Sequence, residues 1–180
     1  MKLHLTRDEF LALWRIHRGY SPLRTDTSVQ RSDGMDLDPI LLAEMDDWYL
    51  RLLLEADAVM LAPEDMAASV DMPVPDGGAV TLALPPEVVR VLAVKLSGWS
   101  RPALILRDPD SRPALMQQHP YTRACAGSPV AVMHTDGTLS LYPALQTDRL
   151  VTLSCAVRRD GEYVFDRAAL SGVSSVDLSI

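Results

Sequence analysis

The stretch from Ala79 to Tyr142 concentrates apolar, strand-forming residues and constrains the fold more than any other part of the chain. Within residues 80–84, every second side chain is large and apolar, which is the period of a half-buried strand. Residues 88–96 are apolar on both faces apart from Arg90 and Lys95. Because such a run suits a strand with neighbours on both faces, it predicts a central strand.

A hairpin is the clearest local signal in this stretch. Asp136-Gly137 stands between two apolar runs, residues 130–134 and residues 139–142. This dipeptide suits a two-residue turn of the primed type, in which both central residues take positive φ. The sequence therefore predicts an antiparallel hairpin with a two-residue turn.

A further pair of strands is predicted closer to the C-terminus. Residues 150–157 alternate apolar and polar side chains, and a shorter apolar run, residues 163–165, follows the turn dipeptide Asp160-Gly161. We expect the short run to be the hairpin partner of the longer one. The last residues, 175–180, also alternate, which predicts a terminal strand that folds back on its own sheet or adds to a neighbour's exposed edge.

Two helices are predicted before the strands. Thr6 and Glu9 have the spacing of a capping box, in which each side chain satisfies a free backbone amide of the other residue. Asp38-Pro39 is a second helix start, because aspartate caps free amides and proline at the first helical position loses no hydrogen bond. The apolar pattern of this second helix continues to Leu61, and part of its wide stripe is expected to face another helix.

The order of these elements indicates the fold class. Helices come first and strands follow, so we expect an α+β fold with N-terminal amphipathic helices and an antiparallel β-sheet, sandwich or small barrel. The predicted division is a helical part, residues 1–62, with two helices and a long polar loop, and a β-rich part, residues 63–180, with a strand-like tail. A chain of 180 residues with 48% hydrophobic residues can bury a substantial core.

Composition disfavours several classes of partner. The formal net charge of −7 is spread along the chain, which argues against direct binding to nucleic acid. Asp8 and Glu9 precede any apolar run long enough for a signal peptide, and no window resembles a membrane span, so a cytoplasmic protein without membrane contact is expected. Cys125 and Cys155 lie in different segments; we expect two buried free thiols, and a disulfide between them stays open.

Candidate chemistry is sparse. His4, His17, His119 and His134 lie in separate segments, and no two have the spacing of metal ligands. Ser128 lacks the second glycine of a nucleophile elbow and precedes a proline. We therefore expect no enzyme, no metal and no cofactor, and we rank a hydrolase that uses His119 or His134 last among the functions considered.

Four segments follow one another in the order found in a known class of virion proteins. They are Leu84-Pro85 with Val88, Val91 and Val94; Ala126-Gly127-Ser128-Pro129; the run from Gly137 to Pro143, with Leu139 and Leu141; and the strand Leu150 to Val157. In this order and approximate spacing, residues 38–158 resemble the head–tail adaptor proteins of tailed phages, the family that includes the tail tubular protein A. Pro86 departs from the family pattern, which has an acidic or polar residue there, and so does the additional capped helix before Asp38.

The resemblance implies a structural subunit that bridges portal and tail in a virion or a resident prophage and acts through self-assembly. It implies a homo-oligomer with portal and tail proteins as partners, made in the cytoplasm of a bacterial host. The residues we expect at its interfaces are Trp48, Tyr49 and Leu52 on the second helix and Val176, Leu178 and Ile180 on the tail.

A binding module is the alternative function. A small β-barrel or sandwich could hold a peptide, glycan or small ligand between the crossing segment, residues 107–128, and the hairpin at Asp136-Gly137. A closed, ligand-lined pocket favours this function, whereas a flat apolar helix face favours the adaptor.

Overall fold

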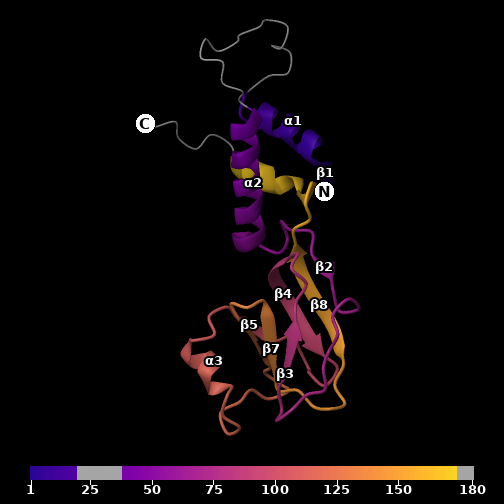
Figure 1. Ribbon diagram of the computed structural model, residues 1–180, viewed down its shortest axis with the longest axis vertical. Helices are drawn as coiled ribbons and strands as arrows, with labels where there is room; N and C mark the ends of the chain where they lie inside the picture. Colours follow the sequence, from indigo (N-terminus) through magenta and orange to yellow (C-terminus); the bar gives the residue numbers. More distant parts are fainter. Residues whose placement is uncertain (20–37, 174–180) are drawn as a thin grey trace, which may run out of the picture. The chain divides into compact units, whose positions relative to one another are not determined.

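The chain folds into two compact units, each with helices or strands around its own core (Figure 1). The computed structural model describes residues 1–19 and 38–173. One unit comprises Met1–Ala62 together with Arg158–Ile180, and the other comprises Pro63–Val157. Helices are combined with antiparallel and mixed sheets, so the prediction of an α+β fold is confirmed.

The first unit contains β1 (Lys2–Thr6), α1 (Arg7–His17), α2 (Asp38–Glu55), β9 (Glu162–Asp166) and the 3-10 helix η2 (Arg167–Val173). The second unit contains β2 (Glu64–Asp65), β3 (Val80–Ala83), β4 (Val88–Leu96), β5 (Leu104–Leu106), α3 (Arg112–Met116), β6 (Val130–Met133), β7 (Thr138–Tyr142) and β8 (Leu150–Val157).

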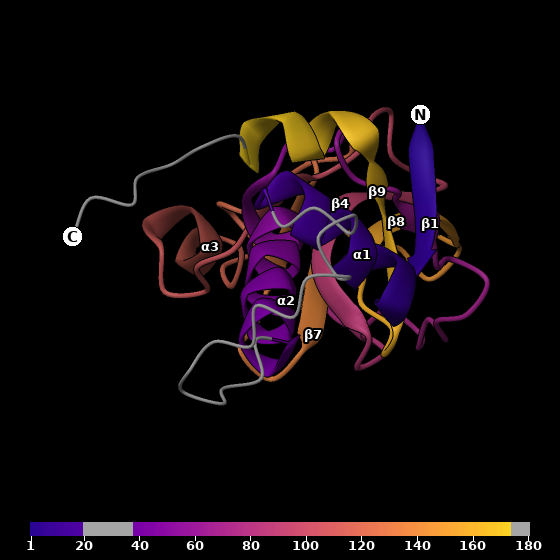
Figure 2. The same ribbon diagram turned by 90° about the horizontal axis from the view of Figure 1, so that it is seen from above.

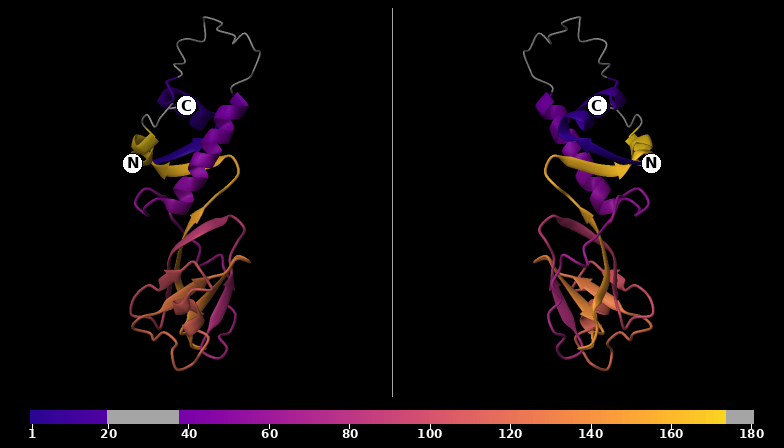
Figure 3. Two further views of the ribbon diagram at one scale, coloured as in Figure 1. Left: turned by 90° about the vertical axis from the view of Figure 1, so that its left-hand side faces the viewer. Right: turned by 90° about the vertical axis from the view of Figure 1, so that its right-hand side faces the viewer.

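β1 and β9 form a two-stranded antiparallel ribbon in the first unit, and α1 and α2 pack against this ribbon (Figure 3). Phe165 of β9 is fully buried and contacts the rings of Phe10, Trp48 and Tyr49. We call the six rings in mutual contact the aromatic cluster: Phe10, Trp14, Trp48, Tyr49, Tyr163 and Phe165. The cluster forms the core of this unit.

The helix starts and ends follow from local chemistry. Thr6 and Glu9 form the predicted capping box at the start of α1. The second predicted helix is too long, because α2 ends at Glu55 and not at Leu61. Leu61 instead forms a β-bridge with Phe165, which requires extended backbone. Tertiary pairing with β9 therefore overrides the helical pattern of these residues.

The predicted division of the chain is right at its first boundary only. The second unit begins after Ala62, as predicted, but the residues from Arg158 onward belong to the first unit and not to the β-rich part. The physical reason is that β9 places Tyr163 and Phe165 in the aromatic cluster and pairs with β1. β9 was predicted to pair with β8, and that pairing is wrong.

Two sheets pack face to face in the second unit, one with the order β2-β8-β4 and the other with the order β3-β7-β6-β5 (Figure 1). Both sheets contribute side chains to one core, and neither closes into a barrel within the described strands. Its fully buried leucines are Leu82, Leu96, Leu139, Leu141 and Leu153. α3 covers the outer face of the four-stranded sheet, where Ala114 packs against Val130 and Val132.

The strand order corrects two expectations. β4 has the predicted bounds, but it lies at an edge of its sheet, and β8 is the central strand. Furthermore, β5 pairs with β6 in parallel, so this sheet is mixed and not wholly antiparallel. The crossing segment between Leu106 and Val130 makes the parallel pair possible, because it carries the chain back to the start of the sheet.

The predicted hairpin forms from β6 and β7, but its turn differs in type. His134 accepts a hydrogen bond from the amide of Gly137 and donates one to the carbonyl of Thr138. This is the pattern of a three-residue loop with a bulge, in which only Gly137 needs positive φ. The tail residues Val176, Leu178 and Ile180 lie outside the described residues.

Candidate functional site

Of the three residues of α2 that we expect at an interface, one lies in the core of the first unit and two are half-buried. Tyr49 is only 2% exposed, and its hydroxyl bonds to the backbone of Val164 in β9. Trp48 is half-buried, with its ring 5.4 Å from that of Trp14, and Leu52 is also half-buried. The structure therefore removes Tyr49 from the candidates for contact with another subunit.

The opposite face of α2 carries apolar side chains that the sequence did not single out. Ile40 and Leu54 are exposed on this helix. The row that faces the core is Leu41, Met45, Tyr49 and Leu53. Because α2 has apolar residues around most of its circumference, periodicity alone could not identify the exposed face.

Tyr163 is a titratable group of the first unit whose pKa is strongly raised. Burial raises the pKa of its phenol to about 12, and the hydrogen bond that it donates to Asp46 Oδ1 at 2.5 Å adds to the shift. Asp46 thus anchors the start of β9 to α2.

We expect this phenol to make the first unit sensitive to high pH. Its pKa is higher in the folded chain than the ordinary value of 10, so its contribution to stability is complete below pH 10 and is lost as the pH rises through about 12. Between pH 9.5 and 11.5, the wild-type chain should lose on the order of 2 kcal/mol more stability than Tyr163→Phe, as measured by urea unfolding. Equal losses in the two proteins would contradict the buried position of this phenol.

A row of hydrogen-bonded polar side chains in the second unit includes His134, one of the two histidines considered for a hydrolase. His134 Nε2 lies 2.9 Å from Ser140 Oγ, and Ser140 Oγ lies 3.0 Å from Thr81 Oγ1. Ser140 is only 5% exposed, so a substrate has little access to its oxygen. The carboxylate of Asp136 accepts hydrogen bonds from the amide and hydroxyl of Thr138. Those two bonds, more than the nearby His134, lower the pKa of Asp136.

This row lacks the usual third member of a catalytic triad. Within residues 1–19 and 38–173, no carboxylate is hydrogen-bonded to the ring of His134. A triad requires such a carboxylate to orient the base. The row therefore reads as a cross-strand hydrogen-bond network on the outer face of the sheet.

The crossing segment, which the binding-module alternative places beside a ligand, packs on the four-stranded sheet. Gln117 is buried, and its side-chain amide bonds both to the carbonyl of Pro113 and to the amide of Ala124. Arg123 donates to the carbonyl of Gln117 and lies over the ring of Tyr142. These contacts fix the crossing segment on the sheet, together with the packing of α3.

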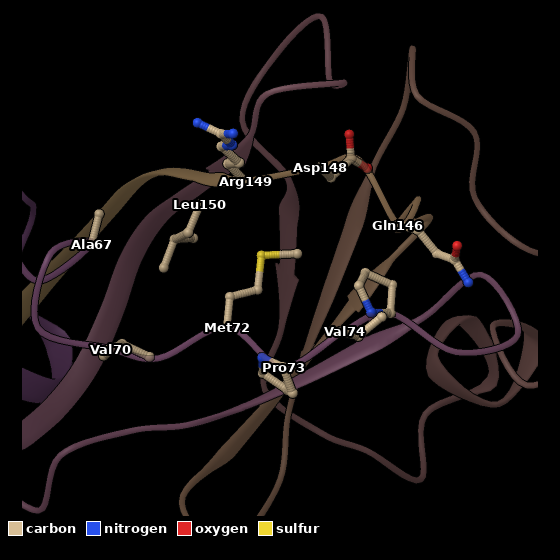
Figure 4. A pocket seen from close by; sticks show the side chains of 10 residues that line it. Ala67, Val70, Met72, Pro73, Val74, Gln146, Asp148, Arg149 and Leu150 are labelled. Carbon is tan, nitrogen blue, oxygen red and sulfur yellow. The ribbon is translucent and has the colours of Figure 1, made fainter.

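A groove of about 290 Å³ lies elsewhere on the second unit (Figure 4). Its apolar part is formed by the connector before β3 and by Leu150 of β8, and the side chain of Met72 lies at its centre. Asp148 and Arg149 stand together on one side. The ten lining residues are Ala67, Val70, Met72, Pro73, Val74, Pro75, Gln146, Asp148, Arg149 and Leu150.

The polar side of this groove is held in place by the loop before β8. Asp148 accepts a hydrogen bond from the amide of Leu145 at 2.8 Å, and its carboxylate lies so close to Gly98 that a Cβ there would clash with it. Arg149 is held through its backbone, which exchanges hydrogen bonds with Ser97. The groove thus has an apolar floor and one charged side chain of each sign. This lining is better suited to binding an apolar side chain of a peptide than to catalysing a reaction.

Membrane spans, metal-binding groups and the two cysteines also bear on function. No helix in the described part of the chain is long and apolar enough to cross a membrane. The described residues contain no group of three or more His, Cys, Asp or Glu side chains that could hold a metal ion. Both cysteines are free: Cys155 is buried as predicted, but Cys125 is exposed, because it lies in a turn and not in a core segment.

No protein-family model matches the sequence, and no curated protein matches it.

Proposed function

We propose that this chain is a structural subunit of a phage virion or resident prophage, a head–tail adaptor that bridges portal and tail through self-assembly. In this function the chain catalyses no reaction and binds no cofactor. Its partners are further copies of itself, the portal protein and a tail protein. It is made in the cytoplasm of the bacterial host and becomes part of the virion on assembly.

The observation that carries the proposal is the arrangement of the four segments that resemble the adaptor family. Leu84-Pro85 closes β3; Val88, Val91 and Val94 lie on β4; Ala126 to Pro129 leads into β6; Gly137 to Pro143 contains β7; and Leu150 to Val157 is β8. They are therefore strands and strand ends of one sandwich, which is what a shared fold would require of motifs far apart in sequence.

Exposed apolar side chains add support. Large ones stand on both units, including Ile40 and Leu54 on α2, and Leu115, Met116 and Tyr121 at and after α3. A subunit that contacts several neighbours needs apolar surface in more than one place.

The test is deletion of the gene from the phage or prophage that encodes it, followed by electron microscopy of the lysate. We expect filled heads and separate tails that do not join, and we expect the wild-type gene supplied in trans to restore joined particles. The variants His119→Ala and His134→Ala should restore them equally, because no histidine chemistry is involved. Joined, infectious particles without the gene would refute the adaptor function, and loss of complementation by both histidine variants would favour an enzyme.

A binding module remains the second candidate, and the groove around Met72 is the observation that favours it. Its volume of about 290 Å³ is near the lower limit for small-ligand pockets, and its apolar floor suits one or two side chains of a peptide. If the groove is the functional site, Met72→Glu should abolish complementation in the deletion strain, whereas Val59→Glu on the other unit should not.

A further inference from the structure

The β1–β9 ribbon has one edge that the first unit covers and one that it leaves open. Hydrogen bonds in an antiparallel pair alternate between facing residues, so the amides and carbonyls of every second residue point away from the partner strand. Arg167 donates to the carbonyl of Met1, which identifies Met1, Leu3 and Leu5 as the residues of β1 that bond to β9. The backbone groups of Lys2, His4 and Thr6 therefore point outward.

The outer edge of β9 is occupied. The amide of Val164 bonds to the hydroxyl of Tyr49, and the amide of Asp166 bonds to the carbonyl of Met60. On β1, by contrast, only the amide of Thr6 has a partner, the carboxylate of Glu9. The outward amides and carbonyls of Lys2 and His4 bond to no other described residue. We call these four groups the open edge of β1.

The side chains beside the open edge also leave room for another strand. Leu3 and Leu5 face the aromatic cluster across from Phe165 and Tyr163, and both are only half-buried. On the other face, a hollow of about 250 Å³ lies against His4, Thr6 and their neighbours on β9. An added strand would cover the two leucines and satisfy the four backbone groups.

We propose that the open edge of β1 binds residues 175–180 of a neighbouring copy as a third strand. In this segment Val176, Leu178 and Ile180 alternate with polar residues, so all three would lie on the face of Leu3 and Leu5. Asp177 would lie on the opposite face, beside Lys2 and His4, where the charges of aspartate and lysine attract one another. Both the apolar pattern and the charge of the segment therefore match the edge.

We take the donor segment from another copy because η2 leads the chain away from the open edge of its own β1. η2 runs from the end of β9 toward the side of the unit where α2 lies, away from β1 (Figure 2). Its seven residues cover about 14 Å at the 3-10 rise of 2 Å per residue. Val176 follows the end of η2 by only three residues, which span at most about 11 Å, so we assign the donor segment to another copy. Unwinding η2 would expose Leu170, which is 2% exposed.

A contact between the tail of one copy and the edge of the next is heterologous, so it repeats from copy to copy and can close into a ring. The inference rests on the proposed function in this respect, since a self-assembling subunit needs such a contact.

Two variants of the full chain separate the donor from the acceptor. His4→Pro removes an outward amide and places the proline ring on the open edge, but it breaks no bond to β9. Leu178→Asp disrupts the apolar face of the donor segment. We expect each variant alone to be monomeric by light scattering at concentrations where the wild-type chain forms oligomers, with association weakened about tenfold or more.

Mixing the two variants gives the decisive measurement. The tail of the His4→Pro chain and the edge of the Leu178→Asp chain are both intact, so an equimolar mixture should form dimers with one copy of each and nothing larger. His4→Ala, which keeps the amide, should assemble like the wild type. Lys2→Pro is a second acceptor variant that should repeat the result if His4→Pro folds poorly, as judged by thermal melting.

A mixture that stays monomeric, or single variants that assemble like the wild type, would overturn the inference. So would a wild-type chain that is monomeric at the highest attainable concentration. None of these results refutes the adaptor function, which the deletion strain tests separately, because subunits could still assemble on the portal. Conversely, joined particles in the deletion strain would refute the adaptor function even if residues 175–180 bind the open edge of a neighbouring copy.

Discussion

Replacement of Phe165 by alanine should cost about 3–5 kcal/mol and leave the first unit at or near its unfolding threshold. The side chain is fully buried, and its ring lies 5.2 Å from that of Phe10 and 5.3 Å from that of Trp48, centroid to centroid. Its backbone also forms the bridge to Leu61. The substitution removes a large apolar group from the centre of the cluster, where the neighbouring rings cannot close the cavity.

The measurement is urea unfolding followed by tryptophan fluorescence. Trp14 and Trp48 lie in the first unit and Trp99 lies in the second, so a Trp99→Phe background makes the signal specific to the first unit. Val59→Ala is the matched control, because Val59 is in the same unit and 83% exposed, and it should change stability by less than about 0.5 kcal/mol. A loss below about 1 kcal/mol for Phe165→Ala would show that β9 does not supply the core of this unit.

The strands of the second unit could be located from the sequence because their signals are local. The bounds of β4 and β8 match the predicted runs, residues 88–96 and 150–157, and Gly137 marks the predicted hairpin. Alternation fixes where a strand lies but not which strand lies beside it, since pairing depends on packing between residues far apart in the chain. This is why β8 pairs with β4 and not with β9.

The error on β4 has a specific physical cause. Its residues are apolar on both faces, which indicated a central strand, yet it lies at an edge. The pairing with β8 shifts register between Val91 and Ala93, so Val91 and Val94, which are an odd number of residues apart, both reach the core. Such bulges break the period of two and imitate the pattern of a strand that is buried on both sides.

The candidate contact surfaces, which are the open edge of β1 and the interface residues on α2, were predictable only in part. The alternation of Leu3 and Leu5 with polar residues is a strand signal, but the run is short and ends at Thr6, the first residue of the capping box, so the helix start is the stronger pattern there. That β1 is an edge strand follows only from the partners of β9. The interface residues chosen on α2 failed at Tyr49 because its hydroxyl and ring both have partners in β9.

The two cysteines should differ in reactivity by a factor on the order of a thousand. Burial raises the pKa of the Cys155 thiol to about 12, with a smaller contribution from Asp65, and a shift of three units from 9.0 lowers the thiolate population about a thousandfold at pH 8. Cys155 is also fully buried between β4 and β2, whereas Cys125 is exposed. Only the thiolate reacts with iodoacetamide, so Cys125 should be alkylated and Cys155 protected.

Mass spectrometry of peptides after alkylation at pH 8, with and without denaturant, measures the difference. We expect one modified thiol in the native chain and two in the unfolded chain, with Cys125→Ser giving none and Cys155→Ser giving one under native conditions. Because Cys155 lies in the core that both sheets share, its protection reports on the closed sandwich itself. Equal alkylation of both cysteines in the native chain would show that the sheets separate readily, and a sandwich that opens in this way could not act as the rigid part of an adaptor.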